Sequence, residues 1–180
     1  MASVTTNLTA LMLEDDPLTS DLSAALMNRA DISVTSVSDS DAALQHFEQI
    51  NLVKTSLDVF ITDGQHPGLP GLHLIRKIRD FPDKMTMQGG LRLRHVPIVT
   101  WSASLLDHSK ITAIDPSIVC VDKPSRFEVL LKAIDNAVRN YRDKILGDLH
   151  YMGVGVQFTG GRFTLVQCYS LPPEKRFESK

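Results

Sequence analysis

Residues 57–71 read LDVFITDGQHPGLPG, and this stretch decides the fold. Its first part is a nearly continuous apolar run that ends in Asp63. Such a run is typical of a central strand that is buried on both faces of a parallel sheet. Its second part is dense in glycine and proline, which indicates a loop. The stretch therefore predicts a buried strand that brings one carboxylate, Asp63, to the start of a loop.

Two other apolar runs also end in charged residues. Residues 11–13 lead into the acidic triplet at 14–16, and residues 118–122 lead into Lys123. If all three runs are parallel strands of one sheet, these charged groups emerge at the same edge. Several carboxylates beside one ammonium group suit a hard divalent cation and phosphoryl chemistry.

Strand and helix signals alternate along the chain, which predicts a parallel sheet with helices on both faces. Five strand–helix units result. The expected strands cover residues 10–14, 32–37, 58–62, 96–101 and 118–121. Residues 80–95 form a long irregular stretch between the third and fourth units.

The expected helices begin at recognisable capping residues. Asp16 caps the first helix, with Pro17 at its first position. Capping boxes at 38–41 and 125–128 open the second and fifth helices, and a short fourth helix covers 105–114. The apolar residues at helical spacing are Leu18, Leu22, Ala25 and Leu26 in the first helix, Ala43, Leu44, Phe47 and Ile50 in the second, Leu72, Ile75 and Ile78 in the third, and Phe127, Leu130, Leu131, Ile134, Val138, Tyr141 and Ile145 in the fifth.

The end of the chain has a different pattern. Apolar residues alternate at 154, 156 and 158 and again from 163, with two glycines at 160–161 between the two runs. This pattern predicts a β-hairpin. The polar residues 172–180 are expected to be disordered. We therefore expect one domain over 8–146 and an extension over 147–180 that holds the hairpin and a polar tail.

Composition narrows the classes of function. The 180 residues carry a net charge of −2, so no basic field points to nucleic acid. No apolar run approaches membrane-spanning length, and residues 1–7 lack the features of a secretion signal. The two cysteines make no disulfide framework, and the six histidines have no metal-ligand spacing. A cytoplasmic protein without a membrane or nucleic-acid partner is expected.

The ordered set of charged and polar residues resembles the receiver domain of bacterial two-component response regulators. The resemblance covers roughly residues 10–141, and its markers are Glu14-Asp15, Asp63 in its Gly/Pro-rich loop, Ser102 after an apolar run, and Lys123-Pro124. It implies a doubly wound, flavodoxin-like sheet of five parallel strands in the order 2-1-3-4-5. The site then lies at the switch point between the first and third strands.

The resemblance also implies roles for the acidic residues, and electrostatics supports them. Two unit charges about 4 Å apart repel by roughly 4 kcal/mol at an effective dielectric near 20, so a converging cluster favours a bound cation. Asp63 is expected to be the phosphoacceptor. Asp15, Asp63 and the backbone carbonyl of Gln65 are expected to bind Mg²⁺ directly, with Glu14 acting through water.

Lys123 and Ser102 complete the expected site. Lys123 is expected to pair with the phosphoryl charge across a cis Lys123–Pro124 bond, and Ser102 to donate its hydroxyl to a phosphoryl oxygen and so move its loop. The chain departs from the family at Cys120, because receivers usually carry Tyr or Phe three residues before the lysine. It also departs at Gly64, which is smaller than the usual residue after the phosphoacceptor.

Simpler interpretations exist for several of these residues. Asp16 is best explained as a helix cap, and Asp63 alone could be a turn former. Lys123 could be solvated, and Ser102 could be an ordinary loop hydroxyl. Trp101 is most simply a packing residue on the fourth strand.

Three classes of function remain open. The first is a signalling receiver that is no enzyme in the usual sense but catalyses its own phosphotransfer and autodephosphorylation. Its partners would be a sensor histidine kinase or phosphotransfer protein and a downstream protein target, with a homodimer as a further possibility. The second is a pseudo-receiver adaptor that works without phosphorylation. The third is a Mg²⁺-dependent aspartyl phosphohydrolase, which the missing Asp-x-Asp spacing after the first strand disfavours.

Overall fold

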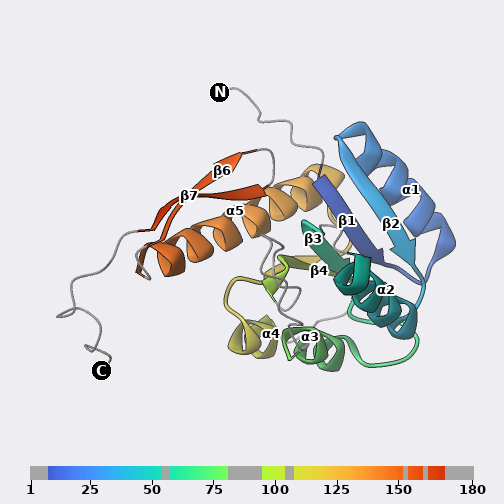
Figure 1. Cartoon of the computed structure of the whole chain (residues 1–180). Helices are drawn as coiled ribbons and strands as arrows, with labels where there is room; N and C mark the ends of the chain where they lie inside the picture. Colours follow the sequence, from blue (N-terminus) through green and yellow to red (C-terminus); the bar gives the residue numbers. More distant parts are fainter. Residues whose placement is uncertain are drawn as a thin grey trace.

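The computed structural model describes residues 8–53, 57–80, 95–103, 108–151, 154–159 and 162–168. Figure 1 shows strands and helices alternating around one main sheet. The strands are β1 (Leu8–Leu13), β2 (Ile32–Val37), β3 (Val59–Thr62), β4 (Ile98–Ser102), β5 (Val119–Asp122), β6 (Val154–Thr159) and β7 (Arg162–Cys168). The helices are α1 (Pro17–Arg29), α2 (Ser40–Val53), α3 (Gly71–Arg79), α4 (His108–Ile114) and α5 (Phe127–Tyr151).

The main sheet has the order β2-β1-β3-β4-β5, and all its strands run parallel. This confirms the predicted flavodoxin-like, doubly wound fold. β2 has the predicted bounds, and the other four strands differ from the predicted bounds by at most two residues. The parallel register brings the ends of β1, β3, β4 and β5 to one edge, where Leu13 pairs with Thr62 and Ser102 pairs with Asp122.

Helices cover both faces of the sheet. One face packs against α2, α3 and α4 through a buried cluster centred on Phe47 and Phe60, whose rings meet edge to face at 5.3 Å. The other face packs against α1 and α5 through a cluster that includes Met12, Met27 and Ile134. β3 is buried along its whole length, as its apolar sequence predicted. Because successive side chains of a strand alternate between faces, each strand contributes to both clusters.

The predicted packing face of α1 is wrong. Leu18 and Leu22 are 80% and 63% exposed, whereas the buried residues of the helix are Ser20, Ser23 and Met27. The two serines are small enough to be buried on this face, and Met27 belongs to the cluster beneath α1 and α5. The sequence pattern alone favoured the leucines because they share a helical spacing, but it could not show which face the sheet would cover.

The caps of α1 and α2 are aspartates. Asp16 accepts the backbone N–H of Thr19 at 2.7 Å, with Pro17 at the first helical position, as predicted. Asp39 accepts the N–H of Ala42 at 2.8 Å and opens α2 within the predicted capping box. Both contacts lower the pKa of the capping carboxyl, because a hydrogen bond from the backbone favours its charged form.

The loop after β3 is held against the start of α2. Leu69 donates its backbone N–H to Ser40 Oγ at 2.7 Å, and Ser40 donates its own N–H to the Pro67 carbonyl at 3.2 Å. Gly68 lies between them with φ of +94°, and a Cβ at this position would overlap Ser40 Oγ. Only glycine fits here, so the loop that follows Asp63 has a defined course.

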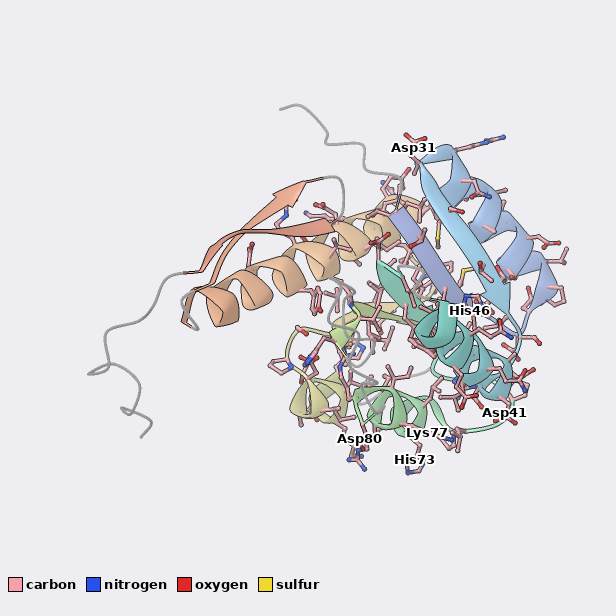
Figure 2. The ribbon with its side chains drawn as sticks, viewed as in Figure 1. Asp31, Asp41, His46, His73, Lys77 and Asp80 are labelled. Atoms are coloured by element: carbon pink, nitrogen blue, oxygen red, sulfur yellow. The ribbon has the colours of Figure 1, made fainter. Side chains whose placement is uncertain are left out.

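α3 buries one face and exposes the other. Leu74, Ile75 and Ile78 are buried, whereas Figure 2 shows His73 and Lys77 on the outside of the molecule. Arg79, at the end of α3, donates to Asp115 at 2.9 Å and to the Val96 carbonyl at 3.0 Å. This ion pair lies at the amino ends of β4 and β5, opposite the edge where Asp63 emerges.

The C-terminal part of the chain confirms the hairpin. β6 and β7 form an antiparallel pair with a register shift between Gly155 and Val156, and β6 lies against α5 (Figure 1). α5 continues to Tyr151, six residues beyond the expected end at Ile145. The boundary between residues 146 and 147 stays a prediction. Residues 81–94, 104–107 and 169–180, which include the expected irregular stretch and polar tail, lie outside the described residues.

Across the described residues, no helix is long and apolar enough to cross a membrane.

Candidate functional site

Backbone hydrogen bonds fix the strand ends that carry the predicted site. The N–H of Asp63 bonds to the Leu13 carbonyl at 3.0 Å, and the N–H of Lys123 bonds to the Ser102 carbonyl at 2.8 Å. The N–H of Glu14 continues the β1–β2 pairing at 3.0 Å. Because these residues directly follow paired strands, their side chains start from positions that the sheet determines.

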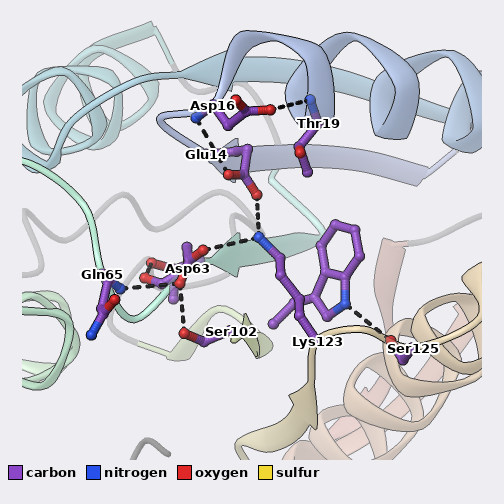
Figure 3. A network of polar contacts seen from close by, with 10 residues as sticks. Glu14, Asp16, Thr19, Asp63, Gln65, Ser102, Lys123 and Ser125 are labelled. Atoms are coloured by element: carbon purple, nitrogen blue, oxygen red, sulfur yellow. Dashed lines mark hydrogen bonds and ion pairs between the residues drawn. The ribbon is translucent and has the colours of Figure 1, made fainter. Parts of the chain in front are cut away.

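Asp63 is held on both carboxylate oxygens (Figure 3). Oδ1 accepts the Ser102 hydroxyl at 2.6 Å and the Gln65 backbone N–H at 3.0 Å, while Oδ2 accepts Lys123 Nζ at 2.9 Å. Burial favours the neutral acid, but the hydrogen bonds from Ser102, Lys123 and Gln65 together outweigh it and lower the pKa of Asp63. Asp63 is therefore ionised near neutral pH.

Lys123 bridges two carboxylates. Its ammonium group pairs with Glu14 and Asp63, and only 15% of the side chain is exposed. Burial disfavours the ammonium, but the two carboxylates prevail and raise the pKa of Lys123. The sequence placed Lys123 near Asp63 but did not predict its contact with Glu14. The Lys123–Pro124 bond is cis, as the resemblance implied.

Three carboxylates gather at this edge. Ligand oxygens of Glu14, Asp15 and Asp63 all lie within 4.8 Å of one another. Glu14 is buried and Asp15 is exposed. Carboxylate oxygens at such spacing fit Mg²⁺, which binds one or two carboxylates and keeps several waters. The donor set is therefore suited to the predicted magnesium ion.

Ser102 and Gln65 both contact Asp63 itself. Ser102 is almost fully buried, and its hydroxyl donates to Asp63 Oδ1. Gln65 contributes its N–H to the same oxygen, and its carbonyl stays a predicted metal ligand. Asp16, interpreted as a cap, also donates its backbone N–H to Glu14 Oε1 at 3.4 Å.

Trp101 belongs to the site as well. Lys123 Nζ lies 4.6 Å from the centroid of the Trp101 ring, and the indole N–H donates to Ser125 Oγ at 3.0 Å. The sequence interpretation assigned Trp101 to packing and Ser125 to a helix cap, and it missed this contact. The available signal was the position of Trp101 directly before Ser102, on the strand beside the one that leads to Lys123.

Cys120 occupies the place where receivers usually carry an aromatic residue. Burial raises the pKa of its thiol, although the neighbouring Thr100 side chain opposes that shift. The thiol is therefore protonated near neutral pH. It packs against the cluster beneath α2, α3 and α4 as a small apolar side chain.

Comparisons with known proteins identify the fold. No protein-family model matches the sequence, and no curated protein matches it significantly. Among solved structures, the chemotaxis response regulator CheY4 of Vibrio cholerae aligns with a TM-score of 0.58 and 20% identity, over 73% of this chain and 99% of that chain. A response regulator receiver domain protein from Clostridium thermocellum aligns with a TM-score of 0.60 and 23% identity, over 77% of this chain and 98% of that chain.

A third structure is the receiver domain of a sensor histidine kinase from Pseudomonas aeruginosa. It aligns with a TM-score of 0.57 and 21% identity, over 74% of this chain and 98% of that chain, and it holds a magnesium ion in its active-site cleft. The chain therefore has the fold of response regulator receiver domains. At one edge of that fold the chain carries an acidic cluster, in which Asp63 contacts both Lys123 and Ser102.

Proposed function

We propose that this chain is a phosphorylation-controlled signalling receiver whose phosphoacceptor is Asp63. The observation that supports this most directly is the set of contacts around the Asp63 carboxylate. One oxygen faces an ammonium group, the other faces a hydroxyl and a backbone N–H, and two further carboxylates lie close by. These groups suit an incoming phosphoryl group, whose oxygens need donors and positive charge.

The phosphoryl donor would be a phosphohistidine on a sensor histidine kinase or phosphotransfer protein. An Asp63 oxygen attacks the phosphorus, the new O–P bond forms, and the P–N bond breaks. The leaving imidazole nitrogen keeps the electron pair and takes up a proton from solvent. Autodephosphorylation ends the phosphorylated state. Water attacks the phosphorus, the bond between phosphorus and the Asp63 oxygen breaks, and inorganic phosphate leaves the regenerated carboxylate.

Lys123 and Ser102 would stabilise the phosphorylated form. Once Asp63 carries the phosphoryl group, Lys123 pairs with its negative oxygens, and the Ser102 hydroxyl moves from Asp63 Oδ1 to a phosphoryl oxygen. Asp15, Asp63 and the Gln65 carbonyl would hold Mg²⁺, with Glu14 acting through water. The ion supplies positive charge that offsets the phosphoryl charge and the clustered carboxylates.

The partner surface would include the start of α1. Leu18 and Leu22 are highly exposed, and α1 begins two residues after Asp15. A protein that brings a phosphohistidine to Asp63 must reach this edge of the sheet, where the two leucines offer apolar area to bury.

Replacing Leu22 with Lys should therefore slow transfer from the protein donor and leave transfer from a small phosphodonor unchanged. Equal slowing with both donors would contradict this docking role.

The C-terminal extension would mediate self-association. The β6–β7 pair stands apart from the main sheet, and a two-stranded hairpin is marginal by itself in water. An exposed strand edge readily pairs with another copy. A chain that ends at Tyr151 keeps α5 and loses the hairpin, so light scattering over a concentration series should show a dimer for the full chain alone. If both forms are monomeric at every concentration, the hairpin packs only within its own chain and does not mediate self-association.

Incubation with acetyl phosphate and Mg²⁺, followed by intact-mass measurement, tests the proposed function. A single phosphoryl adduct that later decays supports the receiver. Continuous release of phosphate without an accumulating adduct would favour the aspartyl phosphohydrolase. Folded protein without adduct or turnover would favour the pseudo-receiver adaptor.

A further inference from the structure

Trp101 contacts Lys123 and Ser125, and the proposed phosphoacceptor scheme gives neither Trp101 nor Ser125 a role. It lies on β4 directly before Ser102, and its side chain joins the cluster beneath α1 and α5. It is the single tryptophan of the chain. Its indole N–H donates to Ser125 Oγ at 3.0 Å, which satisfies the donor and fixes the orientation of the ring. This bond ties the ring to the segment between Lys123 and α5, as the dashed line to Ser125 in Figure 3 shows.

The orientation of the ring matters because of its distance from Lys123. The ammonium nitrogen lies 4.6 Å from the ring centroid, within the range of about 6 Å in which a cation is attracted to an aromatic face. A lysine ammonium has three donors, and Glu14 and Asp63 each take one. The Trp101 ring is thus a third contact that limits where the ammonium group can move.

The three contacts of Lys123 differ in how they respond to phosphorylation. The contact with Asp63 changes when that carboxylate becomes an acyl phosphate, and the contact with Glu14 changes when a cation joins the cluster. The contact with Trp101 depends on neither event, because the ring is uncharged and is held by Ser125.

We propose that Trp101 is a positioning residue that keeps the Lys123 ammonium group at the acidic edge while the charges around it change. The proposal rests on the proposed function for the reaction that Lys123 assists. Ser125 acts one step further out, because it fixes the ring and does not contact Lys123 through any described hydrogen bond.

The matched variants are Trp101→Phe, which keeps an aromatic face without the N–H, and Trp101→Leu, which keeps apolar volume without the face. With acetyl phosphate and Mg²⁺, the rate constant of adduct formation should fall roughly threefold to tenfold in Trp101→Leu, as expected for a lost cation–π contact. Trp101→Phe should stay within about twofold of the wild type. Ser125→Ala keeps the ring but removes the hydrogen bond that fixes it. It should give a smaller decrease, and it tests the proposal if Trp101→Leu does not fold.

A double-mutant cycle separates positioning from packing. In a Lys123→Met background, Trp101→Leu should have no further effect on the rate, because the ring acts through Lys123. An undiminished effect in that background, or equal rates for the Phe and Leu variants, would overturn the proposal.

A second readout does not depend on phosphoryl transfer. In carbon–proton NMR spectra, the Lys123 ε-methylene protons should be shifted upfield by the ring in the wild type. Their chemical shift should return to that of ordinary lysines in Trp101→Leu and should stay upfield in Trp101→Phe. Unshifted wild-type protons would overturn the proposal. If the wild type forms no adduct but its protons are shifted, the proposed function fails while the positioning contact stands.

Discussion

The two ends of the main sheet each hold a partly buried cation beside carboxylates, and the two clusters are built differently. At the amino ends of β4 and β5, Arg79 pairs with one carboxylate, Asp115, at 2.9 Å. At the carboxyl ends, Lys123 faces a group of three carboxylates formed by Glu14, Asp15 and Asp63. The first cluster is formally neutral, whereas the second has three negative charges against one positive charge.

The amino-end cluster is complete without a ligand. Asp115 Oδ2 accepts Arg79, and Oδ1 accepts the backbone N–H and the hydroxyl of Ser117 at 2.9 Å and 2.6 Å. Arg79 also donates to the Val96 carbonyl. Burial lowers the pKa of Arg79, and Asp115 opposes that shift. Such a balanced, hydrogen-bonded pair joins α3, the approach to β4 and the approach to β5, which is a structural task.

In the carboxyl-end cluster the negative charges outnumber the positive charge. Its excess of two negative charges raises its energy unless another cation joins, since like charges about 4 Å apart repel by roughly 4 kcal/mol at an effective dielectric near 20. The difference between the two ends teaches that burial of an ion pair does not by itself mark a functional site. The two ends differ in their charge balance, and only the carboxyl end has an excess of carboxylates among the described residues.

The largest expected effect is the loss of phosphorylation in Asp63→Asn. The amide is nearly isosteric with the carboxylate but is not nucleophilic, so adduct formation with acetyl phosphate and Mg²⁺ should be abolished. The fold should persist, because the change also removes one of the crowded negative charges. Intact mass and circular dichroism measure the two outcomes. An undiminished adduct in the folded variant would show that another residue accepts the phosphoryl group.

At the opposite end, Asp115→Ala should lower the free energy of unfolding by about 3–5 kcal/mol, because it leaves the buried Arg79 charge without its carboxylate. Asp135→Ala is the matched control, since Asp135 pairs with Arg139 on the exposed surface of α5 and its loss should cost only about 0.3–0.5 kcal/mol. Urea unfolding measures both values. Similar losses in the two variants would refute the structural role of the amino-end pair.

Magnesium should stabilise the protein through the carboxyl-end cluster. A ligand present at a hundred times its dissociation constant adds about 2.7 kcal/mol to the free energy of unfolding when it binds only the folded state. Asp15→Asn should lose most of this gain, whereas Asp135→Ala should keep it. Thermal unfolding with and without Mg²⁺ provides the measurement, and an equal gain in both variants would place the ion elsewhere.

The sequence predicted the sheet well for physical reasons. The central strands are mostly apolar, and each is followed by charged or loop residues that mark its end. The aspartate caps of α1 and α2 were equally visible, because Asp16 and Asp39 precede their helices at the spacing that capping requires. The convergence of Asp63, Glu14 and Lys123 followed from parallel strands alone.

The errors and omissions concern side chains whose partners lie far away in the chain. The pattern of α1 contained two possible faces, and only the position of the sheet shows that Met27 points inward and Leu18 outward. The contacts of Lys123 with Glu14 and of Trp101 with Ser125 join residues 109 and 24 positions apart. Spacing rules describe neighbours within one element, so they could not predict these contacts.

The smallest expected effect is a dependence of stability on pH that separates the wild type from Asp63→Asn. Hydrogen bonds lower the pKa of Asp63 in the folded state despite its burial, so its contribution to stability is present above about pH 4 and is lost as the pH falls through the lower folded value. Lys123 has the opposite sign. Its pKa is raised, so its contribution is complete below about pH 10.4 and is lost as the pH rises beyond that value.

Urea unfolding between pH 7 and pH 2.5 should therefore show the wild type losing stability with acid more steeply than Asp63→Asn below about pH 4, because the variant lacks the carboxylate that must take up a proton. Asp135→Ala is the control for general acid effects and should parallel the wild type, since its exposed pair is screened by solvent. If the Asp63→Asn curve also runs parallel to the wild type, the hydrogen bonds from Ser102, Gln65 and Lys123 do not hold Asp63 ionised. In that case Asp63 would contribute no more to the pH dependence of stability than an exposed surface carboxylate does.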